Sequence, residues 1–539
     1  MHVEGVLLFV LAAVAVVVLV HWVAEHTGFP AAALLTLCGI VYALLPGPNI
    51  ELQPEIVLAI VIPPLLYSAA LDASLVAIRQ NLRPVISLSV ALVLATALLV
   101  GIGFEFFVAG ATLAAGVALG AAIAPPDPVA ALAVGQRVGL PGRITTLIQG
   151  EGLLNDATAL TTLTVAVAAA TGDGFSLGRA GGQFLLAASG GLVVGLVVAL
   201  FVRVIRPVTR DPLTANAVSL ATPFAAYLVG EELHVSGVLA VVVAGLIVGH
   251  DAPRVTSGAS RLQVASVWRL VDFMLEGFVF LLIGQQLPAV VRGLSNYATS
   301  TIIIAVAVSV GVVLILRPLW LVLMQLLPRR LHTRLGGGDR RDQQLSWREV
   351  TVMSWAGTRG VISLAAIFTL PLVTDSGAPF PDRDLLLFCA FIVVLVTLVG
   401  QGLTFGPLAR ALGVRANAAD LARNRNEARV AAVESALSRL DEIAHDEHLA
   451  DDTLEAMRQQ LTHRAQRYRG RLDLLSTAGA GELPVSPGYE AALRARRAVI
   501  DAQRDELLRW RDSGRLPDDG LRTLERELDY EERTLPDRR

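Results

Sequence analysis

One apolar stretch of the sequence contains polar residues that could bind ions. Four of them recur at spacings of four, three and four residues, which places them on one face of a helix: Glu151, Asn155, Thr158 and Thr162. Asp156 lies beside this face. A buried carboxyl group can hold a proton near neutral pH, and when it is ionised its oxygens bind hard cations. Asp156 could therefore take up a proton and a cation in turn, and this is the minimum chemistry of cation/proton exchange. Asn155 could add a carbonyl ligand or orient a helix break.

A structural ion pair is the alternative role for these carboxylates. An ionised side chain inside a bilayer costs about 2.5–3.5 kcal/mol on insertion scales, so a neighbouring charge is one reason for its presence. Glu151 suits such a pair better than Asp156 does, and its candidate partners are Arg317 and Arg359, which lie in other apolar segments. Removing one member of a buried pair costs about 3–5 kcal/mol.

Two further apolar segments contain breaks. Residues 124–128 include three prolines and Asp127, and residues 355–360 include two glycines and Arg359. Proline cannot continue a regular helix, and paired broken helices in the inverted repeats of a transporter mark its substrate site. A structural kink is the alternative, but a kink does not call for a charge at each break. We expect Asp127 to neutralise helix N-terminal ends at the first break and Arg359 to neutralise helix C-terminal ends at the second.

The elements that must position these residues are transmembrane helices. Of the 539 residues, 54% are hydrophobic and 17% are charged, whereas soluble domains carry about 25% charged residues. About 20 apolar residues span the hydrocarbon core of a bilayer. The sequence therefore predicts an all-α membrane protein with about thirteen transmembrane helices, two of them broken, at Val6–Trp22, Ala31–Leu45, Ile56–Leu71, Pro84–Phe104, Ala111–Val134, Ile144–Ala170, Phe184–Ile205, Ala215–Val229, Val235–Val248, Trp268–Pro288, Ile302–Leu327, Val350–Leu370 and Leu385–Leu408.

The charge pattern changes after Arg415. We therefore expect a transmembrane domain over residues 1–415 and a soluble helical C-terminal domain over residues 416–539. In the second part, apolar residues at helical spacing predict helices at Ala419–His445, Asp451–Leu475, Pro487–Asp512 and Asp519–Glu532. This part contains no cyclic-nucleotide, Rossmann or metal motif. Its expected roles are packing under the membrane domain, contact with a second subunit or regulation.

The distribution of arginine predicts the orientation in the membrane. The loops after even-numbered spans contain few arginines, whereas many lie at or after the ends of odd-numbered spans: Arg79, Arg83, Arg137, Arg143, Arg203, Arg206, Arg210, Arg254, Arg261, Arg329, Arg330, Arg334, Arg340 and Arg341. Because positively charged loops stay in the cytoplasm, we expect a multi-pass protein of the plasma (inner) membrane with its N-terminus outside and its C-terminal domain cytoplasmic. The start, Met1–Glu4, has no basic n-region, so we do not expect a cleaved signal peptide.

The composition argues against several other classes of protein. The formal net charge of −3 gives no support for nucleic-acid binding. The sequence contains no lysine, which a Walker phosphate loop requires, and Cys38 and Cys389 alone form neither a thiolate cluster nor a disulfide framework. It also has no His-Glu-x-x-His motif and no repeated pore-lining filter. We therefore expect no enzyme and no cofactor. An ion channel and a proton-coupled carrier for another solute stay open as alternatives.

Five segments in order resemble the sodium/proton exchanger branch of the monovalent cation:proton antiporters, specifically its NhaP-type bacterial members: Pro63–Tyr67, Asp127–Ala130, Glu151–Asp156, His234–Gly237 and Gly357–Gly360. The resemblance covers about residues 6–408. It implies a homodimer with a dimerisation domain and a six-helix core domain that holds crossed, broken helices. It also implies an elevator-like exchange of a monovalent cation for a proton.

The resemblance also implies roles for single residues. Asp156 matches the family's ion and proton carrier, and Glu151 matches the acidic member of a structural pair whose arginine is Arg317. The Asn155–Asp156 pair resembles the electroneutral branch, so one cation per proton is implied.

The chain departs from the family pattern at three positions. Many members carry an acidic cation ligand where this chain has Ser68, a Ser where it has Gly152 and a Thr where it has Pro126, although the Pro126 carbonyl can still serve as a ligand. Asp72 lies one turn beyond Ser68. The preferred cation therefore stays open among Na⁺, Li⁺ and K⁺. The expected ion- and proton-binding set is Asp156, Asn155, Pro126, Asp127 and Ser68, with the monovalent cation at Asp156.

Overall fold

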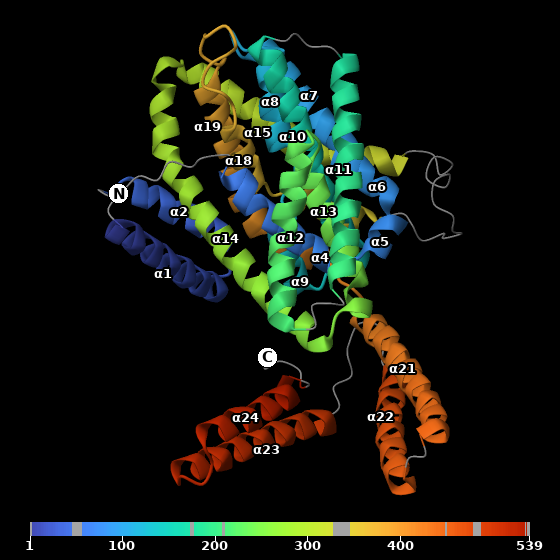
Figure 1. Ribbon diagram of the computed structural model, residues 1–539. Coiled ribbons are helices and arrows are strands. Elements are labelled where there is room, and N and C mark those ends of the chain that lie inside the picture. Colours follow the sequence, from blue (N-terminus) through green and yellow to red (C-terminus); the bar gives the residue numbers. More distant parts are fainter. Residues whose placement is uncertain are drawn as a thin grey trace. The chain divides into compact units, whose positions relative to one another are not determined.

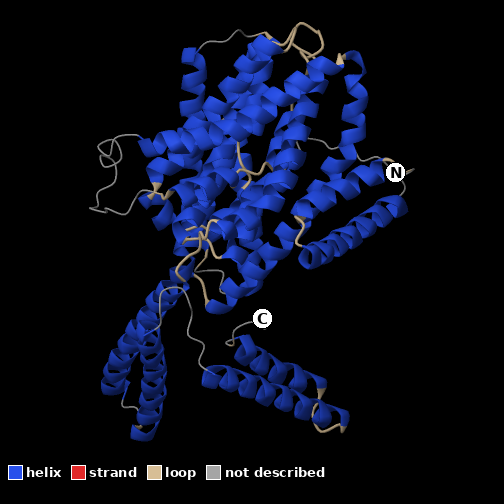
Figure 2. Ribbon diagram, turned by 180° about the vertical axis from the view of Figure 1, so that it is seen from behind, coloured by secondary structure: helices blue, strands red, loops and turns tan. Residues whose placement is uncertain are grey.

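The computed structural model describes residues 3–45, 56–172, 177–206, 211–326, 345–447, 450–477, 487–533 and 535. In these ranges every regular element is a helix, apart from one isolated β-bridge between Val373 and Pro379 (Figure 2). The chain divides into two compact units, Met1–Arg415 and Ala416–Arg539.

The first half of unit 1 contains short and interrupted helices (Figure 1). Pro128 is the first residue of α9, where its missing N–H leaves no helical hydrogen bond unmade, and Pro63 and Pro64 lie just after the junction of η1 and α4. The elements are α1 (Val3–Thr27), α2 (Ala31–Ala43), the π-helix η1 (Val57–Val61), α4 (Ile62–Asp72), α5 (Leu75–Gln80), α6 (Leu82–Ile86), the π-helix η2 (Ser87–Ala91), α7 (Leu92–Phe107), α8 (Leu113–Ile123), α9 (Pro128–Val138) and α10 (Gly142–Thr171).

The second half of unit 1 begins with long helices and ends with another interrupted pair. Serine side chains cap the N-termini of α13, α14 and α17 by accepting from backbone N–H groups. The elements are α11 (Leu177–Ile205), α12 (Pro212–Glu232), α13 (Gly237–Val255), α14 (Gly258–Gly293), the 3₁₀-helix η3 (Leu294–Asn296), α15 (Thr299–Leu326), α17 (Trp347–Trp355), α18 (Val361–Phe368), α19 (Arg383–Val396), the π-helix η4 (Thr397–Gln401) and α20 (Gly402–Ala411).

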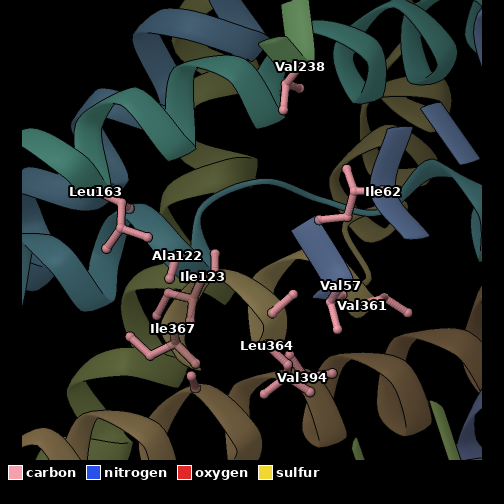
Figure 3. Close-up of a cluster of buried hydrophobic side chains, with 14 of the residues drawn as sticks. Val57, Ile62, Ala122, Ile123, Leu163, Val238, Val361, Leu364, Ile367 and Val394 are labelled. Atoms are coloured by element: carbon pink, nitrogen blue, oxygen red, sulfur yellow. The ribbon is translucent and has the colours of Figure 1, made fainter. Parts of the chain in front are cut away.

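A buried apolar cluster surrounds the ends of the interrupted helices. Ile123 is the last residue of α8 and Val361 is the first of α18, and both belong to this cluster. Figure 3 shows Ile123 close to Ile367 and Leu364 beside Val394, so α8, α18 and α19 meet here. Burial of such side chains is worth about 1.5–3 kcal/mol each, and it holds the helix ends in place.

Eight described helices are long and apolar enough to cross a membrane: Val10–Thr27, Leu82–Phe107, Gly142–Thr171, Gly181–Ile205, Pro212–Glu232, Gly237–Val255, Thr299–Leu326 and Arg383–Ala411. Shorter apolar helices occur at Ala31–Ala43, Val57–Asp72 and Leu113–Ile123. Each of the thirteen predicted segments falls on a helix or on an interrupted helix. The prediction of an all-helical fold is therefore confirmed for the described residues, eight of whose helices are long and apolar enough to span a membrane.

Much of the surface of unit 1 is apolar. Large side chains are highly exposed on α1, α11 and α15, with exposed fractions of 70% for Leu8, 64% for Phe201 and 63% for Ile303. In water such extended apolar surface would favour association, whereas lipid accommodates it.

Unit 2 contains two helical hairpins. Helix α21 (Ala418–Glu447) packs on α22 (Asp451–Thr477), and α23 (Pro487–Asp512) packs on α24 (Asp518–Arg533), as Figures 1 and 2 show. The four helices begin and end within two residues of the predicted bounds. Exposed ion pairs join each hairpin, such as Arg469–Glu434 at 2.6 Å in the first and Arg496–Glu531 at 3.3 Å in the second.

Part of the basis for the predicted orientation lies outside the described residues. This applies to Arg210 and to the five arginines predicted to follow the eleventh span: Arg329, Arg330, Arg334, Arg340 and Arg341.

Candidate functional site

The first helix break separates α8 from α9. Helix α8 ends at Ile123, and α9 begins at Pro128 with Asp127 as its N-cap. The Asp127 Oδ1 atom accepts a hydrogen bond from the Val129 backbone N–H at 2.9 Å. The prolines between the two helices prevent a continuous hydrogen-bond ladder, so free backbone groups face each other at both helix ends.

The second break separates α17 from α18, and it is hydrogen-bonded to the first. The Asp127 backbone N–H donates to the Thr358 carbonyl at 2.7 Å, and the Thr358 hydroxyl donates to the Asp127 carbonyl at 3.2 Å. Gly360 makes this approach possible, because a Cβ atom there would lie 2.0 Å from the Asp127 Oδ2 atom. The Asp127 carboxylate thus lies at the N-terminal ends of both α9 and α18, where helix dipoles favour a negative charge.

Arg359 supplies the opposite charge at the same crossing. Its Nε atom donates to the Ile123 carbonyl at the end of α8 at 2.6 Å, and its Nη1 atom donates to the Gly357 carbonyl beyond α17. The Arg359 backbone N–H donates to the Thr397 hydroxyl at 3.0 Å. The guanidinium, only 3% exposed, therefore satisfies carbonyl groups at two helix C-terminal ends.

Helix α10 lies against this crossing through its polar face. The Asn155 Nδ2 atom donates to the Pro126 carbonyl at 3.0 Å, while its Oδ1 atom is buried with no hydrogen-bond partner among the described residues. Asp156 is 4% exposed and lies within electrostatic range of Asp127. Gly152 allows the close contact, since a Cβ atom there would lie 2.4 Å from Pro128.

The buried ion pair of the site joins Glu151 to Arg317. The Arg317 Nη2 atom donates to Glu151 Oε2 at 2.9 Å, and Nη1 donates to the Oε1 atom of the same carboxylate. The Arg317 Nε atom donates to the Met353 carbonyl at 3.1 Å. The pair therefore connects α10, α15 and α17. Of the two arginines weighed as partners, Arg317 makes this contact, and Arg359 lies at the helix crossing.

Ser68 lies on α4 and contacts an acidic residue that the sequence reasoning had not identified. Its hydroxyl donates to Asp272 Oδ2 at 2.5 Å. Asp272 and Glu276 are one turn apart on α14, and Glu276 lies within electrostatic range of both Asp272 and Asp127. Asp72 is exposed at the end of α4 and interacts electrostatically with Asp272.

Asp272, Thr358 and Thr397 are among the residues of this site whose roles the sequence did not predict. Asp272 lies inside the predicted tenth span, Trp268–Pro288, and a charge in such a span is a signal that could have identified it. Thr358 carries no comparable signal, because its hydrogen bond depends on the crossing of two segments far apart in sequence.

These contacts define a class of protein. Two interrupted helices cross within an apolar helical unit, charged side chains satisfy their free ends, and a buried carboxylate lies beside them. This arrangement is typical of ion-coupled secondary transporters.

Comparisons with known proteins agree with this class. Residues 11–411 match the family model described as the transmembrane sodium/hydrogen exchanger. An uncharacterised Na⁺/H⁺ exchanger of Mycobacterium tuberculosis is 32% identical over 516 residues, which cover 94% of this chain and 91% of that protein. A sodium, potassium, lithium and rubidium/H⁺ antiporter of Bacillus subtilis is 33% identical over 67% of this chain and 55% of its own length.

A solved structure has the same fold. The sodium proton antiporter MjNhaP1 of Methanocaldococcus jannaschii superposes with a TM-score of 0.61 at 20% identity, over 76% of this chain and 99% of that one. This chain belongs to the sodium/hydrogen exchanger family.

Proposed function

We propose that this protein exchanges a monovalent cation for a proton across the plasma membrane, with Asp156 as the shared carrier. The observation that carries the proposal is the position of Asp156, which is 4% exposed and adjacent to Asn155, the residue that binds the helix break. A carboxylate beside a break can bind a cation when ionised or hold a proton when neutral, but it cannot hold both. Coupling of the two fluxes follows from this competition.

Electroneutral exchange follows from the same competition. The carrier group has one negative charge, which either one proton or one monovalent cation neutralises, so the loaded site is neutral in both directions of transport. In this scheme Asp127 and Arg359 neutralise the partial charges at helix ends. The pair of Glu151 and Arg317 holds α10 in register with α15 and α17. The carbonyl of Pro126 and the side chain of Asn155 complete the ligand set.

The finer architecture is part of the proposal. We infer about thirteen transmembrane helices with inverted repeats, each repeat holding one interrupted helix. Residues 1–415 would form the transmembrane domain, with the N-terminus outside, and residues 416–539 a cytoplasmic helical domain. The protein would act as a homodimer.

Sodium is the first cation to test, with lithium and potassium next. The names of the relatives from Bacillus subtilis and from Aphanothece halophytica, the second a Na⁺/H⁺ antiporter that is 31% identical over 77% of this chain, support this order. Membership of an exchanger family argues against a channel, and so does the absence of a repeated pore-lining filter from the sequence.

Proton flux in everted membrane vesicles from an antiporter-deficient host tests the proposal. We expect saturable proton efflux on addition of NaCl, LiCl or KCl, and its loss in Asp156→Asn. Asp375→Asn is a matched control, because it makes the same chemical change on an exposed loop. Exchange at the wild-type rate in Asp156→Asn would remove Asp156 from the mechanism. No response of the wild-type protein to any of the three cations would contradict the proposed function.

A chain that ends at Ala416 tests the role of the C-terminal helices. If they regulate transport, the truncated protein will exchange with a shifted pH profile. An unchanged profile at unchanged abundance in the membrane would contradict a regulatory role.

A further inference from the structure

The middle of α14 carries charges that need an explanation. Arg269, Asp272 and Glu276 occur within eight consecutive residues of this 36-residue helix, and an apolar run, residues 277–284, follows them. An ionised residue inside a transmembrane segment is costly and marks an ion pathway or a partner charge. In the part of the chain that the structure describes, neither Asp272 nor Glu276 forms an ion pair within 4 Å.

The two oxygens of Asp272 have different surroundings. Oδ2 accepts from the Ser68 hydroxyl at 2.5 Å, and Ser68 is only 6% exposed. Oδ1 is buried and has no hydrogen-bond partner among the described side chains and backbone groups. Buried polar atoms in proteins almost always have a hydrogen-bond partner. The Oδ1 atom of Asp272 can therefore still bind a proton or a cation.

The carboxylates of α14 connect to the helix crossing. Glu276 lies within electrostatic range of Asp272 on one side and of Asp127 on the other, and Asp127 lies within range of Asp156. Asp72, at the exposed end of α4, interacts with Asp272 in turn. Each of these carboxylates therefore interacts electrostatically with at least one other member of the set, and their summed field attracts cations.

We propose that Asp272 and Ser68 form a second, transient cation site on the route to Asp156, and that this site sets the apparent affinity for the transported cation. The inference rests on the proposed exchange function. A carboxylate oxygen and a hydroxyl oxygen are hard ligands suited to a monovalent alkali cation. When the cation arrives, the Ser68 hydroxyl can turn its lone pair toward the ion. One carboxylate and one hydroxyl bind such an ion weakly, which allows it to move on.

The competing explanation is a structural hydrogen bond that only joins α4 to α14. The two explanations differ in what they change. Loss of a cation site raises the apparent KM for the cation and leaves the maximal rate, because the carrier Asp156 is intact. Loss of a structural bond lowers the amount of folded protein or the maximal rate and leaves the KM.

Cation-dependent proton flux in everted vesicles, measured across NaCl concentrations, separates these explanations. For Asp272→Asn we expect about a tenfold higher KM with the maximal rate within about twofold of wild type. For Ser68→Ala we expect a smaller rise, about threefold, because the carboxylate remains. Glu105→Gln, an exposed acid on α7, is the matched control and should leave both parameters unchanged.

A variant that exchanges the two side chains, Ser68→Asp with Asp272→Ser, keeps the inference testable if Asp272→Asn does not fold. It retains one carboxylate and one hydroxyl across the same contact, so we expect a KM within about threefold of wild type. A wild-type KM in Asp272→Asn, or a KM in the exchanged variant as high as in Asp272→Asn, would overturn the inference. A wild-type protein without cation-dependent flux would instead contradict the proposed function.

Discussion

The ion pairs of the two units use the same side-chain chemistry in opposite surroundings. In unit 1, Glu151 and Arg317 have side chains only 1% and 3% exposed, and Arg317 also donates to the Met353 carbonyl. In unit 2, Arg504 lies 2.5 Å from Asp529 and 2.7 Å from Glu532, but the side chains of these acids are 58% and 40% exposed. Water and salt can replace the partner in the second case and not in the first.

This difference separates a required contact from an adjustable one. Loss of either member of the buried pair leaves a charge without compensation in a dry site. Loss of Arg504 leaves two carboxylates that water can solvate. The α23–α24 hairpin depends more on its buried apolar residues, which include Ile500, Leu521 and Leu528.

The largest expected effect is the loss of one partner of the buried pair. Glu151→Gln leaves the Arg317 guanidinium buried without a counter-charge, and we expect it to reduce the free energy of unfolding by about 3–5 kcal/mol. Thermal unfolding of the detergent-purified protein would measure the loss. A change below about 1 kcal/mol would mean that the buried pair behaves like a surface pair.

Removing both charges sharpens the same comparison. The double variant Glu151→Gln with Arg317→Met leaves no uncompensated charge, so it should be more stable than Glu151→Gln alone. If the double variant is instead as unstable as the sum of its single variants, the two residues are not coupled.

The next largest effect concerns volume at the helix crossing. Gly360→Ala places a methyl group 2.0 Å from Asp127 Oδ2, which must force the two breaks apart, and we expect a loss of about 1–3 kcal/mol together with reduced exchange. Gly470→Ala is the matched change in unit 2, where α22 has no atom within 4 Å of the new Cβ atom. That variant should gain about 0.5–1 kcal/mol from helix propensity. Equal melting temperatures for the two variants would contradict this contrast.

The smallest expected effect is the loss of an exposed pair. Arg504→Gln should cost about 0.2–1 kcal/mol of hairpin stability at low salt, and the difference from wild type should shrink as salt is raised. Circular dichroism of the full-length protein during thermal unfolding, at low and high ionic strength, would measure it. A loss of stability that does not depend on salt would indicate that Arg504 stabilises the hairpin by packing of its aliphatic stem and not by its charge.

Local sequence patterns were sufficient to predict most helices and both helix breaks. Apolar runs mark the membrane segments. Prolines and glycines change the backbone at their own positions, so the breaks at residues 124–128 and 355–360 could be identified without knowledge of any tertiary contact. The four helices of unit 2 followed from apolar spacing for the same reason. The count of spans and their repeat relationship stay predictions.

Contacts between distant segments could not be predicted in this way. Residue types and spacing alone left both Arg317 and Arg359 open as partners of Glu151, because both are arginines in apolar segments, and only the family resemblance pointed to Arg317. Which of the two arginines contacts Glu151 depends on which helix packs against α10. The contact of Asp272 with Ser68 could not be predicted, because Ser68 is 204 residues away and has no charge.

The sequence by itself determined that this chain is helical, membrane-embedded, interrupted at two places and equipped with buried charges, because each of these properties follows from composition and short-range spacing. The tertiary structure alone decided that the two breaks hydrogen-bond to each other and that Asp272 meets Ser68, and it shows the contact between Arg317 and Glu151 that the family resemblance had implied. The physical reason is that hydrogen bonds and ion pairs act over a few ångströms. Only the packing of helices far apart in sequence brings these groups within that distance.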